Sequence, residues 1–244
     1  MLHRLLPHIH FPWTTRVMGF IALGTQVPPL VVLRQRIHPA KRRAFFLPHA
    51  LLEPPFTLFC IGNLLSFMGL YVPYFYITNY AQSKAGMSQD LAFYMLPIIN
   101  GSTIIGRLIP NFLGDKLGPL NSFLPFIFSS AVLAFAWIRI ENAAGLIVFA
   151  VLYGSCAGAI VSVPSAVVAK LTTSMHEVGT RMGMCFLFQG IGVLIGTPIA
   201  GAIIKLHEAY YVRAQIFCGA LLVAASVFML MSRIACSRHV LYKT

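Results

Sequence analysis

Long runs of hydrophobic residues are separated by short polar stretches along most of the chain. A helix rises about 1.5 Å per residue, so a run near twenty residues can cross a hydrocarbon core about 30 Å thick. Strands of a membrane barrel would show short alternating segments instead, and these runs do not alternate. The pattern therefore predicts an all-α membrane protein with seven apolar segments, over residues 17–33, 56–80, 91–113, 121–138, 143–169, 184–204 and 214–235.

The segments at the two ends of the chain need separate treatment. The first apolar segment is short and is interrupted by Pro28 and Pro29. The preceding stretch, MLHRLLPHIHFPW, lacks the apolar core and small-residue cleavage site of a signal peptide. We prefer a mobile tail there, with metal binding by its three histidines as the alternative. The expected organisation is a tail (1–16), a transmembrane helix (17–33), a basic cytoplasmic linker (34–55), a six-helix bundle (56–235) and a cytoplasmic tail (236–244).

Composition agrees with a membrane protein. Of the 244 residues, 58% are hydrophobic and only 10% are charged, whereas a soluble domain carries about 25% charged residues. The 18 Lys and Arg residues outnumber the six Asp and Glu residues, which gives a net charge of +12. In a soluble protein this excess would suggest nucleic acid. In this apolar chain it indicates cytoplasmic loops beside anionic lipid, so we expect the lipid bilayer and no nucleic acid as a partner.

The distribution of basic residues predicts the topology. If the 34–55 linker is cytoplasmic, the loops at 114–120 and 170–183 and the C-terminal tail share that side of the membrane. Twelve of the 18 basic residues then fall in or beside these regions. Because basic loops favour the cytoplasm, we expect the linker and the C-terminus inside and the N-terminus outside.

No pattern in the chain indicates an enzyme or a cofactor. Ser/His/Asp, HExxH and phosphate-loop motifs are absent, and the six acids are scattered. The five cysteines form no CxxC or Cys/His spacing that would hold a metal. They are expected to be buried free thiols, at Cys60, Cys156, Cys185, Cys218 and Cys236.

Small residues recur at intervals of four within two of the segments. Gly154 and Gly158 form one such pair, and Gly192 and Gly196 form another. This spacing lets helix backbones approach closely in lipid, where packing must replace the hydrophobic effect. We therefore expect close helix–helix contacts at these glycines.

The stretch GRLIPNFLGDKLGP places charge at the end of an apolar run. Arg107 lies about 9 Å inside the predicted segment. Its side chain could extend to the cytoplasmic interface, or it could face a water-filled pathway and bind an anionic group. We prefer the second interpretation.

Asp115 and Lys116 are predicted to lie in a tight Gly/Pro turn between two spans. The later segment that begins near HEVGTRMGM has a helix N-terminus with positive partial charge. Asp115 docked there, near Arg181, would hold two helices together as a conformational latch. A solvated charge in the turn is the alternative.

Other polar residues within the apolar runs are weaker candidates. Asn63 and Tyr74 lie in a polar and aromatic stretch that could face a solute, although its tyrosines also fit an interfacial aromatic belt. Glu53 precedes two prolines and fits a helix start better than a proton carrier. Gln189 fits a hydrogen bond between helices better than a pathway position.

The motif NFLGDKLGP resembles the cytoplasmic loop signature of the major facilitator superfamily. Asn111 and Pro119 depart from the signature, which is matched at Leu113, Gly114, Asp115, Lys116 and Gly118. The longer stretches INGSTIIGRLIPNFLGDKLGPLN, SVPSAVVAKL, EVGTRMGMCFLFQGIGVLIGTPIAGAII and PYFYITNYA resemble the fungal monocarboxylate-transporter-like branch of that superfamily. The resemblance extends over about residues 11–235.

This resemblance implies a fold and a function. Such transporters have twelve spans in two halves, with the solute pathway between the halves. The first segment here resembles span six and the next six resemble spans seven to twelve. The chain would then be a C-terminal half plus one preceding helix, and a complete pathway would need a missing N-terminal half or a homodimer.

The resemblance also implies a set of solute-binding residues. Arg107 matches an arginine of the eighth span implicated in substrate and proton binding. Thr103 stands where animal relatives often carry an aspartate, and a threonine cannot carry a proton. We expect Asn100, Asn63 and Tyr74 to complete the substrate site.

The function expected from the resemblance is transport of monocarboxylates or related small organic solutes across the plasma membrane. Whether a proton moves with the solute stays open. A non-transporting regulatory membrane fragment is the alternative. A seven-span receptor is a weaker one, because it gives no reason for the Asp-Lys motif and the RMGM segment downstream.

Overall fold

The structure is a computed structural model, which describes residues 2–33, 45–172, 174–204 and 211–241, and the side chains of 11–33, 45–172, 174–204 and 211–237. Seven helical spans in these ranges are long and apolar enough to cross a membrane, which confirms the predicted all-α membrane fold. The elements are α1 (Leu2–Val32), η1 (Pro48–Leu52), α2 (Pro54–Leu70), α3 (Val72–Ser83), α4 (Gln89–Leu117), α5 (Pro119–Ala136), η2 (Trp137–Arg139), α6 (Ala143–Leu171), α7 (Val178–Ile203) and α8 (Val212–Leu241).

The chain divides into two units, Met1–Arg42 and Arg43–Thr244. In the first unit, α1 begins at Leu2, so the expected tail over residues 1–16 is wrong. Apolar residues continue upstream of residue 17, and a membrane helix tolerates prolines such as Pro12 within it. Residues 34–44 of the expected linker lie outside the described residues.

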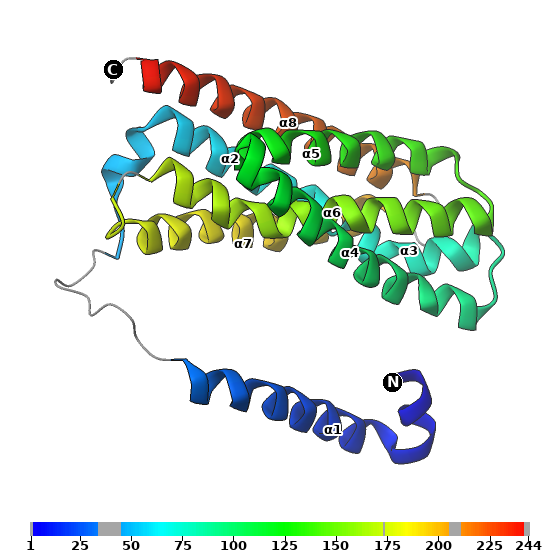
Figure 1. The fold of residues 1–244 in the computed structure, drawn as a ribbon. Helices are drawn as coiled ribbons and strands as arrows, with labels where there is room; N and C mark the ends of the chain where they lie inside the picture. Colours follow the sequence, from blue (N-terminus) through cyan, green and yellow to red (C-terminus); the bar gives the residue numbers. More distant parts are fainter. Residues whose placement is uncertain (1, 34–44, 173, 205–210, 242–244) are drawn as a thin grey trace. The chain divides into compact units, whose positions relative to one another are not determined.

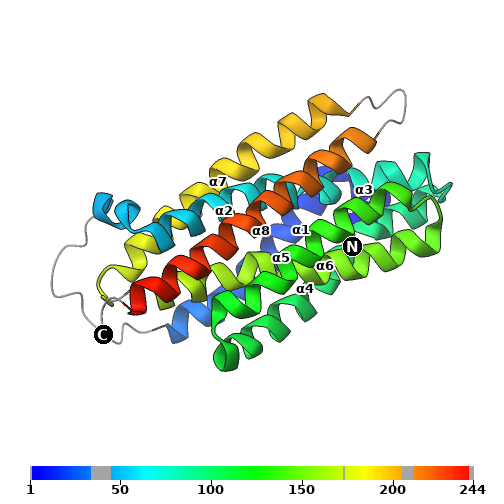
Figure 2. The same ribbon diagram turned by 90° about the horizontal axis from the view of Figure 1, so that it is seen from above.

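In the second unit, helices α2 to α8 lie side by side along a common direction (Figures 1 and 2). Helix α4 packs on α6, α2 packs on α7 and α8, and α5 packs on α6 and α8. Helices α2, α5 and α7 begin, and α4, α6 and α8 end, at what we call the linker end of the bundle. Hydrogen bonds join helices there: for example, Ser232 Oγ donates to the Pro55 carbonyl at 2.7 Å, and Arg233 Nε donates to Asn121 Oδ1 at 2.6 Å.

Glycines allow two of these helix pairs to approach closely. A Cβ added to Gly154 or Gly158 of α6 would collide with the backbone carbonyls of Ile99 or Thr103 in α4. On α7, the same change at Gly192 or Gly196 would collide with the Leu64 or Met68 carbonyls of α2. The predicted close contacts at both glycine pairs are confirmed.

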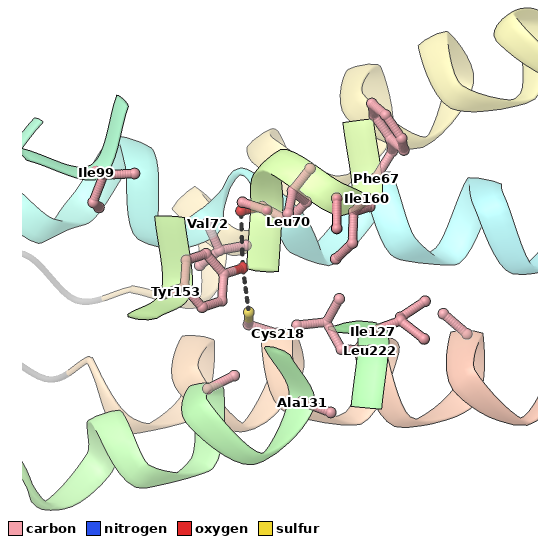
Figure 3. Packing of buried hydrophobic residues seen from close by; sticks show 14 of the residues in the cluster. Phe67, Leu70, Val72, Ile99, Ile127, Ala131, Tyr153, Ile160, Cys218 and Leu222 are labelled. Carbon is pink, nitrogen blue, oxygen red and sulfur yellow. Dashed lines mark hydrogen bonds between the residues drawn. The ribbon is translucent and has the colours of Figure 1, made fainter. Parts of the chain in front are cut away.

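The second apolar segment is broken between α2 and α3. Pro73 has no N–H and cannot donate the helical bond to the Gly69 carbonyl. That carbonyl instead accepts from the Tyr71 N–H and from the Cys218 thiol, whose sulfur lies 3.3 Å away. The Tyr153 hydroxyl donates to the Leu70 carbonyl at 3.0 Å (Figure 3). Since both side chains are fully buried, neighbouring helices satisfy the backbone groups freed by the break.

The connection from α4 to α5 differs from the predicted loop. Helix α4 continues to Leu117, so Asp115 and Lys116 lie in its last turn rather than in a turn between spans. Gly118 alone makes the reversal, with φ 89° and ψ 142°, a conformation that favours glycine. Pro119 then starts α5, a position where its missing N–H costs no helical bond.

Two other helix ends differ from the sequence-based expectation. Helix α7 begins at Val178 instead of near residue 184, which places Arg181 in its first turn. Helix α8 runs to Leu241, so most of the expected tail over residues 236–244 is helical. Both extensions consist of residues too polar for the apolar pattern to include.

Candidate functional site

Helix α4 carries a polar stripe made of Asn100, Thr103, Arg107 and Asn111. These residues recur at intervals of three and four and therefore lie on one face of the helix. Arg107, Asn100 and Asn111 are exposed and Thr103 is half-buried, while Gly106, just before Arg107, is buried against α6. The stripe thus runs beside the packed face of α4 and is open in this bundle.

The neutral members of the stripe bond to backbone carbonyls of their own helix. Asn100 Nδ2 donates to the Leu96 carbonyl at 3.0 Å, and Thr103 Oγ1 donates to the Asn100 carbonyl at 2.7 Å. Asn111 Nδ2 donates to the Arg107 carbonyl at 2.6 Å. Within the described part of the chain, no carboxylate lies within ion-pair distance of the Arg107 guanidinium. The stripe therefore presents one unpaired cation.

Arg107 lies deep enough for its charge to matter. It stands ten residues before Leu117, the last residue of the 29-residue α4. The helix is about 43 Å long, so if it is centred in a core about 30 Å thick, Arg107 lies roughly 8 Å inside the hydrocarbon. An arginine at this depth is costly unless it meets water or an anion.

Tyr74 of α3 is another residue predicted to bind substrate. Its side chain is half-buried. The Tyr71 ring packs on it, with centroids 5.6 Å apart. The neighbour observed for the Tyr74 ring is thus the Tyr71 ring.

Asn63 occupies a different environment from the stripe. It is fully buried between α2 and α7, where its amide donates to the Cys185 sulfur at 3.0 Å. Gln189 of α7 is also buried. The structure therefore places Asn63 in a helix–helix contact and does not bring it to Arg107.

An ionic cluster of Glu53, Glu177 and Arg181 lies at the linker end. The Arg181 side chain is only 3% exposed and binds Glu53 with two parallel bonds, 2.6 Å from Nη1 to Oε2 and 2.7 Å from Nη2 to Oε1. Its Nε and Nη2 also donate to Glu177 Oε2, at 3.2 and 3.1 Å. His49 Nε2 lies 3.5 Å from Glu177 Oε1. The cluster joins the start of α2 to the start of α7.

The predicted pairing of Asp115 with Arg181 is wrong, because Glu53 and Glu177 occupy the guanidinium. Helix α7 packs on α2, which brings Glu53 to Arg181, whereas α4 packs on α6. Asp115 and Lys116 instead line a cavity together with Lys170 of α6. The four-residue spacing of Glu177 and Arg181 could have identified one partner from sequence. No local signal identifies Glu53.

A solved structure resembles this fold. The solved structure of the Escherichia coli fucose:proton symporter FucP aligns with a TM-score of 0.68 and 16% identity, over 90% of this chain and 55% of that one. The chain therefore has the fold of about half of that symporter.

Curated fungal transporters are similar in sequence. The chain is 39% identical over 205 residues to the MFS-type transporter dbaD of Emericella nidulans, covering 84% of this chain and 46% of that protein. It is 34% identical over 223 residues to the aspyridones efflux protein apdF of the same species, covering 91% and 45%. It is 34% identical over 238 residues to the MFS transporter asaE of Aspergillus flavus, covering 96% and 53%. The chain thus spans about half the length of these relatives. No family model matches it.

Proposed function

We propose that this chain forms one half of a solute transporter of the major facilitator superfamily. Helices α2 to α8 correspond to the C-terminal six spans of that fold, and α1 corresponds to the span before them. A solute pathway then needs a second wall, from an N-terminal half or from a second copy of the chain. The proposal is supported by the transporter relatives and by a chain that spans about half their length.

The polar stripe of α4 binds the solute, and Arg107 supplies the binding charge. Its guanidinium can hold a carboxylate with two charge-assisted hydrogen bonds, in a site where hydrocarbon makes each bond stronger than in water. Tyr74, Thr103 and Asn100 add neutral hydrogen-bonding groups beside it. The observation that carries this assignment is the exposed and unpaired Arg107 within a membrane helix. The substrates are monocarboxylates or related small organic solutes at the plasma membrane, and Asn63 contributes only through the α2–α7 contact.

The polar stripe of α4 carries no proton-carrying acid beside Arg107. Thr103 cannot carry a proton, and the acids among the described residues lie at helix ends, at Glu53, Asp90, Asp115, Glu141 and Glu177. A fucose:proton symporter shares the fold, and a proton-carrying group of this transporter would lie outside the polar stripe. Relatives named as efflux proteins favour export as the direction of net transport.

A chimera tests the proposal. We would take the part of the Emericella nidulans transporter dbaD that this chain does not match and fuse it in front of the chain. The fusion protein is then reconstituted in vesicles. Uptake of a panel of labelled monocarboxylates is then measured. We expect transport by the chimera, and none by either part alone unless this chain pairs with itself. A chimera no more active than empty vesicles would overturn the half-transporter proposal.

Substitutions in the same chimera test the role of Arg107. Losing two charge-assisted bonds costs about 3 kcal/mol, so Arg107→Ala should lower uptake on the order of 100-fold. Arg107→Lys should retain part of it, since lysine keeps the charge without the planar fork. Ile105→Ala, at an exposed position elsewhere on α4, is the matched control and should transport normally. Unchanged uptake by Arg107→Ala would remove Arg107 from the site.

A further inference from the structure

Two cavities at the linker end share the turn between α4 and α5. The smaller, about 240 Å³, has apolar walls from Leu120, Val167 and Leu171, and Lys170 and Arg233 also line it. The larger, about 800 Å³, is lined in part by Asp115, Lys116 and Lys170. Lys170 lines both cavities. We call Lys116, Lys170 and Arg233 the basic corner.

The basic corner has more positive than negative charge. Asp115 is the one acid that lines either cavity among the residues that the structure describes. None of the three cations makes an ion pair within the described ranges. Arg233 is held by its bond to Asn121 in the first turn of α5, and Lys116 Nζ lies 4.9 Å from the Phe112 ring centroid. The corner therefore has charge left to bind an anion.

The position of the corner indicates where that anion comes from. Lys116 and Lys170 lie in the last turns of α4 and α6, at the depth where a spanning helix leaves the hydrocarbon. Large apolar side chains are exposed beside them on α4, including Phe112 at 63% and Leu117 at 58%. A soluble anion would contact the cations but not these apolar side chains. A phospholipid would contact the cations with its phosphate and the apolar side chains with its acyl chains.

We infer that the basic corner binds the phosphate of an anionic glycerophospholipid, with an acyl chain along the apolar walls of the smaller cavity. Basic pockets between helices on the cytoplasmic side are suited to anionic headgroups. A bound lipid bridges α4, α6 and α8 and stabilises their linker end. This inference does not depend on the proposed transport, because it concerns the linker end of the bundle, and none of Lys116, Lys170 and Arg233 belongs to the polar stripe.

The test measures thermal unfolding of the purified chain in nanodiscs of phosphatidylcholine, with and without phosphatidylserine. A dye that fluoresces on reaction with thiols reports unfolding, because four of the five cysteines are buried. At about 100-fold excess of lipid over its Kd, the midpoint should rise by roughly 5–10 °C. The triple variant Lys116→Gln, Lys170→Gln, Arg233→Gln should lose this rise, since each cation contributes about five-fold in affinity.

Controls separate a built site from general attraction to a charged membrane. Lys84→Gln with Arg139→Gln removes two exposed basic residues at the opposite end and should keep the rise. Asn121→Ala removes the hydrogen bond to Arg233 but no charge, so this variant should keep most of the rise in midpoint. It therefore separates loss of lipid binding from loss of structure. Soluble glycerophosphoserine or inorganic phosphate, added to phosphatidylcholine discs, should have no effect. Three results would each overturn the inference: a rise in midpoint in the triple variant, loss of the rise in the Lys84/Arg139 control, or an equal rise with a soluble phosphate.

Discussion

The ionic cluster should be strongly coupled, because its cation is buried and its acids are not. Arg181 is 3% exposed, whereas the side chains of Glu53 and Glu177 are 37% and 29% exposed. Glu53→Gln leaves a buried guanidinium with one charged partner in place of two. Arg181→Met leaves two carboxylates that water can still reach.

The size of the effect follows from these contacts. Breaking a buried ion pair costs about 3–5 kcal/mol, while replacing both partners costs much less. Because Glu53 is partly exposed, we take the lower limit and expect Glu53→Gln to cost about 3 kcal/mol, which lowers Tm by roughly 6–12 °C in a chain of this size. The double variant should be no less stable than Arg181→Met alone. That corresponds to a coupling energy of at least about 3 kcal/mol.

The thiol-dye unfolding assay measures all four members of this double-mutant cycle in one detergent. Lys84→Gln, an exposed charge at the opposite end, serves as the control and should shift stability by less than about 0.5 kcal/mol. Costs of Glu53→Gln and Arg181→Met that add within about 0.5 kcal/mol would refute the coupling.

Two further predictions concern the packing of the bundle. Gly106→Val should disrupt the α4–α6 contact, because an added Cβ would overlap the Ser155 backbone. Gly101→Ala, which has open space around it, should be tolerated. The folded yield after size exclusion compares the two variants, and equal yields would argue against the close contact. Tyr153→Phe should lower the free energy of unfolding by about 1–2 kcal/mol in the thiol-dye assay, since it removes the Tyr153 hydroxyl that donates to the Leu70 carbonyl at the helix break. An unchanged Tm would show that another group satisfies this carbonyl.

Much of the fold could be predicted from the sequence, because the hydrocarbon core imposes long apolar runs and leaves little choice of secondary structure. The glycine pairs were predictable for the same reason, since lipid-embedded helices need small residues to pack. The helix ends were not, because α7 starts with the polar residues before Arg181 and α4 runs on through Asp115. Hydropathy cannot distinguish such turns from loops.

The candidate site was only partly predictable. Arg107 was conspicuous as a charge in an apolar run. The intervals of three and four residues on α4 then place the other members of the polar stripe on the same face of the helix. The partner of Arg181 required knowledge of which helices pack together, since Glu53 is 128 residues away in the chain. Asn63 has the same chemistry as Asn100, but it is fully buried where Asn100 is exposed. Residue type alone could not separate their roles.

The accessibility of position 107 to water tests most directly whether the stripe lines a solute pathway. Arg107→Cys, in the chimera, is treated with a charged, membrane-impermeant thiol reagent, and Ile105→Cys on the same helix is the lipid-facing comparison. A thiol in hydrocarbon cannot form the reactive thiolate, so the cysteine at 107 should react on the order of ten-fold faster and be protected by a transported carboxylate. Equal, slow reaction at both positions would place residue 107 in lipid and exclude it from the pathway.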